Sequence, residues 1–394
     1  MISSKNRKDQ IIPISVPSIK GNEWKYIKEC LDTEWVSTAG RFVDTFEEEF
    51  CDSMKVQHAV ACINGTSALQ VALRIVGVKA GDEVIVPTVT FIAPVNALRY
   101  INAEPVFMDC DEFYNIDIAK TIQFIEKETI FQDGTTTNRK TGKRISAIVP
   151  VHVFGNAADL EALMHVCKQR NIRIVEDATE SLGSSYTRGE LSGRFTGTVG
   201  DIGCYSFNGN KIMTTGGGGM LVTNNDGYAK KASYLVSQAK DDPVRYIHNE
   251  VGYNYRLTNI QAAMGVAQLE KLQEFIEAKE QNYKIYKDGI DKIHGLHLNE
   301  TPDYAQSNYW FYCLQVDKEK YGKDRDELIE HLSKSGIQSR PLWYLNHMQV
   351  PYKSCQSYAI DKAYDLLEKT INIPCSANLT EKQIKKVIKV LGNG

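Results

Sequence analysis

The segment HAVACINGTSALQVALRIV, residues 58–76, passes from an apolar run to a helical pattern within a few residues. His58–Cys62 is short and apolar, which predicts a strand, and Ser67–Val76 has apolar residues at helical spacing. The polar residues between them mark the point where the strand gives way to the helix. A strand followed directly by a helix is the repeating unit of a parallel sheet covered by helices.

The same alternation continues from about residue 57 to residue 223 and predicts an α/β domain with a largely parallel sheet. The predicted strands are His58–Cys62, Glu83–Pro87, Glu104–Met108, Ile145–Val151, Arg173–Glu176, Ile202–Ser206 and Gly219–Thr223. The predicted covering helices are Ser67–Val76, Ala93–Tyr100, Asp117–Glu126 and Ala157–Arg170. One connection, Phe131–Arg144, is polar and contains an Asp-Gly turn signal, so we expect an exposed hairpin or loop there.

After Thr258 the pattern changes to one long helix from Asn259 to about Tyr283. The remainder mixes short strands with charged helices, which is typical of a smaller α+β domain. It includes a predicted strand at Trp310–Val316 and predicted helices at Arg325–Lys334 and Glu381–Val390. We therefore predict a large α/β domain over residues 1–265 and a small C-terminal α+β domain over residues 266–394.

The composition limits the class of protein. The chain has 394 residues, of which 42% are hydrophobic and 24% charged, so it can bury two or three folded cores. Lys and Arg number 46 against 49 Asp and Glu, and the net charge of −3 provides no basic field for nucleic acid or anionic lipid.

The cysteines and the termini predict the compartment. Nine cysteines are scattered from Cys30 to Cys375 without a CxxC pair, which disfavours a disulfide framework and a metal site. The N-terminal stretch Met1–Gln10 is polar and lacks the apolar core of a signal peptide, and no apolar run approaches the length of a membrane span. We expect a cytoplasmic protein with neither nucleic acid nor membrane as a partner, and with no metal.

Asn64-Gly65-Thr66-Ser67 lies at the junction of the first strand and helix. Free N–H groups and the helix dipole favour an anion there, and Gly65 permits its close approach. These features predict a phosphate-binding site. The alternative is an ordinary helix N-cap, since many such junctions bind nothing.

Glu176-Asp177 ends an apolar strand at the carboxyl edge of the sheet, where open α/β sheets collect their ligands. A carboxylate at that edge is well placed for function. Taken alone, an acid at a strand end is more often an N-cap or a loop charge.

Lys211 follows the strand Ile202–Ser206 in a turn that precedes four glycines, Gly216–Gly219. Burial lowers the pKa of a lysine and makes its amine a nucleophile that forms Schiff bases. The alternative is a solvated loop lysine. A phosphate site, a strand-end carboxylate and an imine-forming amine on one sheet are together what pyridoxal phosphate requires.

The chain resembles the DegT-type (DegT/DnrJ/EryC/StrS) nucleotide-sugar aminotransferases over nearly its whole length. The blocks that carry the resemblance are WVSTAG at 35–40, NGTSAL at 64–69, GDEVIVP at 81–87 with Thr90-Phe91, PVHVFG at 150–155, EDA at 176–178, Ser206-Phe207 with Lys211, and GYNYR at 252–256. The resemblance implies a large domain of the aspartate-aminotransferase fold (fold type I of the pyridoxal phosphate enzymes). It also implies a pyridoxal 5'-phosphate cofactor.

The resemblance further implies roles for single residues. Lys211 matches the catalytic lysine that binds the cofactor covalently, and Asp177 matches the carboxylate that keeps its ring nitrogen protonated. Thr66, Ser67 and Ser206 match its phosphate ligands.

Three further positions concern the cofactor ring and the partner subunit. Phe91 matches the aromatic residue that stacks on the ring, a role that suits a planar apolar side chain. Asn254 matches an asparagine that reaches the cofactor phosphate of a neighbouring subunit, which implies a homodimer with shared active sites. Glu180 departs from the family, which commonly has Gln or His near the cofactor's ring oxygen, and its role and protonation are left open.

Five residues are predicted to bind the substrate. Arg340, Trp343 and His347 fall in a segment, SRPLWYLNH at 339–347, that matches the family's substrate-facing loop. His248 and Arg256 flank the position of Asn254. The alternative for each is a packed or surface polar residue with no ligand.

The expected activity is amino transfer from L-glutamate to the keto carbon of a nucleotide-linked 4-keto-6-deoxy sugar in bacterial surface-glycan biosynthesis. The sequences of the motifs are most similar to those of the family branch that serves legionaminic-acid-type or bacillosamine-type sugars, which favours a 2-acetamido sugar. The nucleotide is left open among UDP, GDP and dTDP. Two alternatives stay open: an aminotransferase of an amino-cyclitol or aromatic-ring precursor, and a pyridoxal phosphate-binding regulator without catalysis.

Overall fold

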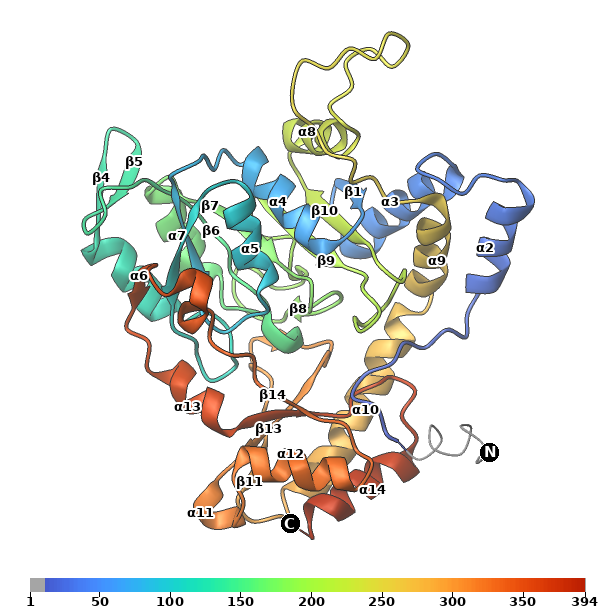
Figure 1. Ribbon diagram of the computed structural model, residues 1–394, viewed down its shortest axis with the longest axis vertical. Helices are drawn as coiled ribbons and strands as arrows, with labels where there is room; N and C mark the ends of the chain where they lie inside the picture. The colour runs from blue at the N-terminus through green and yellow to red at the C-terminus, as the bar shows by residue number, and fades with distance from the viewer. Residues whose placement is uncertain (1–10, 394) are drawn as a thin grey trace.

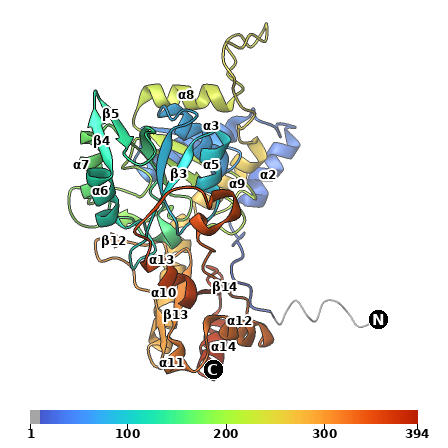
Figure 2. The same cartoon turned by 60° about the vertical axis from the view of Figure 1, so that its left-hand side comes forward.

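The computed structural model describes residues 11–393 (Figure 1). The N-terminal stretch Met1–Gln10, on which the absence of a signal peptide was argued, lies outside the described residues, as does Gly394. A large unit built on a central sheet lies above a smaller unit in this view, and helix α10 (Leu272–Ile290) runs from one to the other (Figures 1 and 2).

The large unit contains an eight-stranded sheet with the order β1-β10-β9-β7-β6-β2-β3-β15. Its strands are β1 His58–Cys62, β2 Glu83–Pro87, β3 Glu104–Met108, β6 Ile145–Ile148, β7 Arg173–Asp177, β9 Ile202–Ser206, β10 Gly219–Thr223 and β15 Ser357–Tyr358. Strand β10 pairs antiparallel with β1 and β9, and the other pairs are parallel. The predicted, largely parallel α/β sheet is confirmed.

Helices cover both faces of the sheet (Figure 1). They are α2 Glu23–Asp32, α3 Arg41–Met54, α4 Gly65–Ile75, α5 Ala93–Tyr100, α6 Ile118–Lys127, α7 Glu161–Gln169, α8 Asp226–Val236 and α9 Asn259–Leu269. Alternate residues of β1 enter different cores: Val60 packs with residues of α4, α5 and α8, whereas Ala59 packs with residues of α3 and α9. Both faces are apolar because both are covered.

The small unit has a four-stranded sheet with the order β11-β13-β16-β14. These strands are β11 Leu296–Leu298, β13 Tyr312–Val316, β14 Arg340–Pro341 and β16 Thr370–Ile373, and the helices nearby are α10, α11 Lys318–Tyr321, α12 Arg325–Lys334, α13 Lys362–Lys369 and α14 Glu381–Leu391. One core cluster joins α10, α12 and α14 to this sheet. The division at residues 265/266 stays a prediction.

Two short sheets complete the fold. The polar connection forms the predicted hairpin, with β4 Thr129–Gln132 paired antiparallel to β5 Thr135–Asn138 (Figure 2). Strand β8 Ser185–Tyr186 pairs with β12 Ala305–Gln306, which ties the large unit to the chain that enters the small sheet.

The structure corrects four predicted boundaries. The single helix predicted from Asn259 to about Tyr283 is two helices, α9 and α10, because α9 packs on α2 and α3 whereas α10 packs on α14 and β11. Strand β6 ends at Ile148, two residues before Pro150, which has no N–H for a ladder. Helix α7 begins at Glu161 and β13 at Tyr312, both later than predicted.

Among residues 11–393, no helix is long and apolar enough to cross a membrane. Within the same range, no three or more His, Cys, Asp or Glu side chains gather in a way that suits a metal ion. The nine cysteines are free, and seven of them are buried.

Candidate active site

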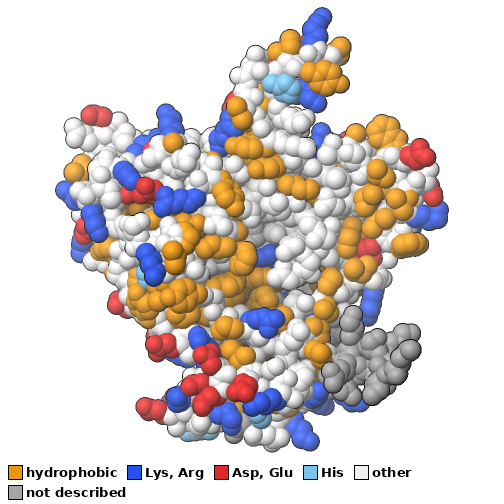
Figure 3. Space-filling model, in the orientation of Figure 1, with side chains coloured by type: hydrophobic (Ala, Val, Ile, Leu, Met, Phe, Trp, Pro, Cys, Tyr) orange, Lys and Arg blue, Asp and Glu red, His pale blue; other side chains and the backbone are white. Residues whose placement is uncertain are grey.

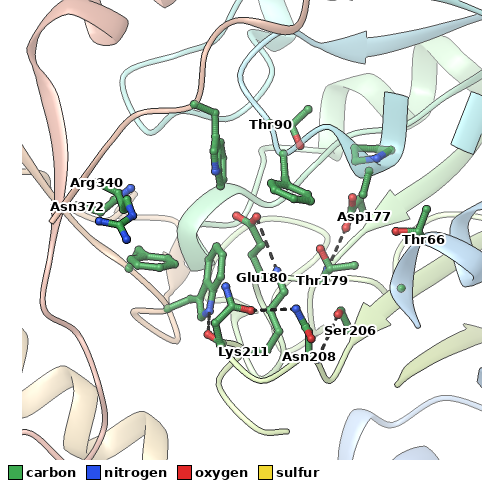
Figure 4. A pocket seen from close by; sticks show the side chains of 18 of the residues that line it. Thr66, Thr90, Asp177, Thr179, Glu180, Ser206, Asn208, Lys211, Arg340 and Asn372 are labelled. Carbon is green, nitrogen blue, oxygen red and sulfur yellow. Dashed lines mark hydrogen bonds and ion pairs between the residues drawn. The ribbon is translucent and has the colours of Figure 1, made fainter. Parts of the chain in front are cut away.

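A cavity of about 690 Å³ lies where the carboxyl ends of the strands meet the small unit (Figure 4). The segments that follow β1, β2, β7 and β9 supply one side of it, and the small unit supplies Trp310, Arg340, Trp343 and Asn372. In this view Arg340 and Asn372 lie opposite Thr66 and Asp177. The parallel strands end at one edge, so residues far apart in the sequence meet there.

The N-terminus of α4 faces this cavity through Gly65 and Thr66. Asn64 is the N-cap, and its side-chain oxygen accepts a hydrogen bond from Ser67 N at 2.8 Å. A Cβ added at Gly65 would lie 2.9 Å from the Cβ of Ser206. The backbone and Ser206 are thus close enough that only glycine leaves the space open.

Asp177 is the last residue of β7 and is 2% exposed. Its Oδ1 accepts a hydrogen bond from Thr179 N at 3.0 Å. Burial raises the pKa of the Asp177 carboxyl, while hydrogen bonds from Thr179 and the charge of Lys211 oppose that rise. A cation placed beside Asp177 in the cavity would therefore stabilise its ionised form.

Lys211 lies in the loop between β9 and β10, and Glu180 follows β7 (Figure 4). The Lys211 Nζ is 3.9 Å from Glu180 Oε1, and both side chains are nearly inaccessible to solvent. Burial lowers the pKa of Lys211, although the charges of Glu180 and Asp177 oppose it. Burial raises the pKa of Glu180 to about 7, and Glu180 Oε2 accepts a hydrogen bond from Phe154 N at 2.9 Å.

Aromatic rings form one wall of the site. Trp343 stacks on Phe154 with ring centroids 4.6 Å apart and meets Phe91 edge-on at 6.4 Å. Phe91 is 55% exposed and lines the cavity, so its face is available to a planar ligand. Arg340 is the one guanidinium among the described lining residues, and its Nη1 donates to Ser339 O at 2.9 Å.

Of the residues predicted for the site, Gly65, Thr66, Phe91, Asp177, Glu180, Ser206, Lys211, Arg340 and Trp343 line the cavity together. Ser67 is buried in α4 outside the lining, and His347 lies between Thr88 Oγ1 at 2.7 Å and Tyr364 OH at 2.8 Å. Burial lowers the pKa of His347.

Three other predicted residues do not line this cavity. Asn254 is exposed and forms an isolated bridge with Ser237, and His248 is exposed on the loop before it. Arg256 Nη2 is 3.7 Å from Asp44 Oδ1.

The cavity also contains residues that the sequence did not single out as site residues. They include Thr90, Thr179, Asn208, Asn210, Trp310, Tyr344 and Asn372. Three of them lie within two residues of a predicted site residue in the sequence: Thr179, Asn208 and Asn210. Their closeness in sequence to predicted site residues could have indicated them. Trp310 and Asn372 reach the site through long-range packing of the small sheet, which no local motif indicates.

The comparisons with known proteins agree with this geometry. The model of the DegT/DnrJ/EryC1/StrS aminotransferase family matches residues 17–392. GDP-perosamine synthase of Caulobacter vibrioides is 37% identical over 96% of this chain and 97% of its own. The Bacillus subtilis protein EpsN, whose name describes it as a putative pyridoxal phosphate-dependent aminotransferase, is 34% identical over 96% of this chain and 95% of its own.

The fold has solved counterparts. The crystal structure of a DegT/DnrJ/EryC1/StrS aminotransferase from Brucella abortus superposes with a TM-score of 0.84 at 26% identity, covering 94% of this chain and 95% of that one. The chain therefore belongs to the DegT/DnrJ/EryC1/StrS family of aminotransferases, enzymes that depend on pyridoxal phosphate and act on nucleotide-linked sugars.

Proposed function

We propose that this enzyme moves an amino group from L-glutamate to the keto carbon of a nucleotide-linked 4-keto-6-deoxy sugar. The observation that carries the proposal is the convergence of Asp177, Lys211 and the N-terminus of α4 on one cavity. Each group alone has an ordinary structural explanation. Together they match the three demands of pyridoxal phosphate, which are an anion site, a partner for the ring nitrogen and an amine.

The residues present fit that cofactor. Gly65 and Thr66 offer N–H groups at the start of α4, and Ser206 offers a hydroxyl, for its phosphate. Asp177 would pair with the ring nitrogen, since a positive charge there offsets the effect of burial on this carboxyl. Phe91 would cover one face of the ring. Ser67 does not line the cavity, so it would contribute to phosphate binding only as a residue of the first turn of α4.

Lys211 is the proposed catalytic residue. When bound, pyridoxal phosphate would supply a carrier for the amino group and an electron sink for the charge on the reacting carbon. Because burial lowers the pKa of Lys211, its Nζ is able to accept a proton from the donor carbon and return one to the acceptor carbon. Glu180, beside it, would hold or release a proton near neutral pH.

The substrate would enter along the wall that includes Trp343 and Arg340. Trp343 offers an apolar ring to a sugar or a base, and the exposed guanidinium of Arg340 suits a diphosphate or the carboxylates of glutamate. His347 is held by Thr88 and Tyr364, so we assign it to shaping the loop next to Trp343.

We also propose a homodimer with shared active sites. The loop between α8 and α9 projects from the large unit and carries apolar side chains at its tip (Figures 1 and 3). Val244, Tyr246 and Val251 are 83%, 73% and 75% exposed. A second copy would cover them and bring His248, Asn254 and Arg256 toward the neighbouring cavity.

The sugar class rests on the relatives. GDP-perosamine synthase, described above, favours a GDP-linked sugar. The sequences of the motifs favour a 2-acetamido sugar and leave the nucleotide open among UDP, GDP and dTDP. A panel of nucleotide-linked 4-keto-6-deoxy sugars, with and without a 2-acetamido group, separates these candidates.

The first experiment is the visible absorption spectrum of the purified protein, reconstituted with pyridoxal phosphate, before and after L-glutamate. We expect a band from the bound cofactor that bleaches as glutamate is added. The bleached protein is then mixed with GDP-linked and UDP-linked 4-keto-6-deoxy sugars, and return of the band identifies the acceptor. A protein that binds no cofactor contradicts the whole proposal, and a band that glutamate leaves unchanged contradicts the donor.

A further inference from the structure

Trp310 connects the small unit to the loop that carries Lys211. It lies two residues before β13 and is 3% exposed. Its indole N–H donates to the carbonyl oxygen of Asn210 at 2.8 Å. Since Asn210 is bonded directly to Lys211, this hydrogen bond fixes the peptide from which the lysine side chain extends.

The ring of Trp310 also faces the amine of Lys211. The Nζ lies 4.0 Å from the ring centroid. Among the described residues this amine has no hydrogen-bond partner, and the Glu180 carboxylate at 3.9 Å is beyond hydrogen-bond distance. A Trp face is the strongest aromatic partner for an ammonium group, and its attraction grows when water is excluded.

Trp310 is itself fixed by contacts that include the segment of Glu180. Its backbone N–H donates to Asn308 Oδ1 at 2.9 Å. The amide nitrogen of Asn308 donates to the carbonyl oxygens of Glu180 at 3.1 Å and Leu182 at 2.9 Å. One short segment of the small unit thus orients both groups that flank the Lys211 amine.

We propose that Trp310 is a positioning residue for Lys211: its N–H fixes the loop, and its ring face holds the protonated amine whenever the lysine is not bonded to the cofactor. The proposal rests on the function proposed above for Lys211. In the proton transfers proposed above, the amine alternates between a neutral and a protonated form in a site largely shielded from solvent. The ring face stabilises the positive charge of the protonated form without forming a hydrogen bond to the amine, as a carboxylate would.

The test measures the Lys211 amine of the apoenzyme directly. Its reductive methylation is followed from pH 6 to 10 by peptide mass spectrometry in the wild type and in Trp310→Leu. Leu keeps an apolar contact but provides no attraction for the ammonium group, so the midpoint of the methylation profile moves to lower pH. The charges of Glu180, Asp177 and Arg340, which surround the amine in the cavity, are the same in both proteins.

Two further variants separate the ring face from packing. Site-specific incorporation of 5,7-difluorotryptophan at position 310 keeps the shape and the N–H but weakens the ring's negative face, so the midpoint shifts in the same direction as in Trp310→Leu. Tyr312→Phe is the matched control, because it removes one hydrogen bond, donated to Lys279 O at 2.7 Å, from a buried aromatic residue two positions away. Its midpoint stays at the wild-type value.

The reconstituted enzyme supplies the second readout. Trp310→Leu is expected to lower kcat about tenfold or more while the KM for glutamate changes little, and Trp310→Phe, which keeps a ring face but lacks the N–H, restores part of kcat. An unchanged midpoint in the leucine and difluoro proteins overturns the proposal, as does loss of kcat only in proportion to loss of melting temperature. If the wild type transfers no amino group at all, the proposed function fails. The methylation profile would still show whether the Trp310 ring stabilises the protonated Lys211 amine.

Discussion

Glu180 and Lys211 place a carboxylate oxygen and an amine 3.9 Å apart, with both side chains largely shielded from solvent. At that separation they interact by charge without sharing a hydrogen bond. Burial disfavours the ionised form of both groups, which raises the pKa of Glu180 and lowers that of Lys211. Burial therefore brings the two pKa values toward each other, and the Glu180 carboxyl changes its protonation state near pH 7.

This relationship predicts a pH-dependent stability. The pKa of Glu180 rises from 4.5 to about 7 on folding, so the native state holds a proton that the unfolded state releases between those values. The stabilising effect is complete below pH 4.5 and is lost as the pH rises through about 7. Glu180→Gln removes this dependence. Urea denaturation of the apoproteins from pH 4.5 to 8 should show the variant gaining stability relative to the wild type as pH rises.

A constant difference in unfolding free energy across that range would contradict the raised pKa of Glu180. Burial also raises the pKa of Glu47 to about 7, and Glu47 accepts a hydrogen bond from the backbone N–H of Ala61 at 2.8 Å. Since both proteins contain Glu47, its contribution cancels in the difference.

Lys211→Ala tests the catalytic assignment. The substitution removes a side chain that makes no hydrogen bond among the described residues, so the fold should persist with a melting temperature close to that of the wild type. Amino transfer should fall by at least about a thousandfold, because the proton-moving amine is lost. Circular dichroism and a coupled assay for 2-oxoglutarate measure the two effects. Activity near the wild-type level would remove Lys211 from the mechanism.

The sequence predicted the large sheet well because its strands are buried on both faces. His58–Cys62 and Glu83–Pro87 are continuous apolar runs bounded by polar turns, and the structure has them at those bounds. The break between α9 and α10 was missed because no Gly or Pro marks residues 270–271 and both sides repeat apolar residues at helical spacing. The two helices are distinguished only by their packing, because α9 packs on the large unit and α10 packs on the small one.

The site shows a similar division. Asp177 and Lys211 were singled out because Asp177 ends one strand and Lys211 follows another at the same edge, which is a local signal, and both line the cavity. His347 was expected to face the substrate, but both ring nitrogens are within hydrogen-bond distance of Thr88 and Tyr364. The sequence predicts Trp310 only as the first residue of a strand. Its contact with Lys211 depends on how the small sheet meets the large one, and sequence spacing carries no information about that.

Mixed dimers test whether the active sites are shared. Asn254→Ala should weaken retention of the cofactor, because an amide that we place beside the partner's phosphate is lost. In a dimer of one Asn254→Ala chain and one Lys211→Ala chain, the first chain has its own Lys211 and receives Asn254 from the second. One native site should therefore form, and activity should exceed that of either variant alone. Differently tagged chains, refolded together and purified by both tags, provide the sample.

Mixed dimers with no more activity than the Asn254→Ala homodimer would mean that Asn254 serves its own subunit or neither. Arg245→Ala is a suitable control on the same projecting loop, since its guanidinium pairs only with the neighbouring Asp242 at 2.8 Å among the described residues. It should change dimer formation and cofactor retention little.

Gly65→Ala tests the anion site at the start of α4. The backbone of Gly65 is helical, so alanine is compatible with it, but the added Cβ would lie 2.9 Å from Ser206 Cβ and 3.0 Å from Thr179 Cγ2. Either those side chains shift or the methyl group enters the space proposed for the phosphate. The affinity for pyridoxal phosphate should fall by about tenfold or more, a loss of about 1.4 kcal/mol. Fluorescence titration of the apoproteins measures it, and inorganic phosphate should compete less well in the variant.

Gly209→Ala is the matched control, because it lies in the Lys211 loop and a Cβ added there meets no described atom within 4 Å. Its affinity for the cofactor should match that of the wild type. A comparison of the two variants thus distinguishes a general effect of a substitution near the cavity from the specific loss of space for the phosphate beside the backbone of Gly65. If Gly65→Ala and Gly209→Ala bind the cofactor equally well, the phosphate does not lie against the first turn of α4, and Ser206 must bind it from another direction.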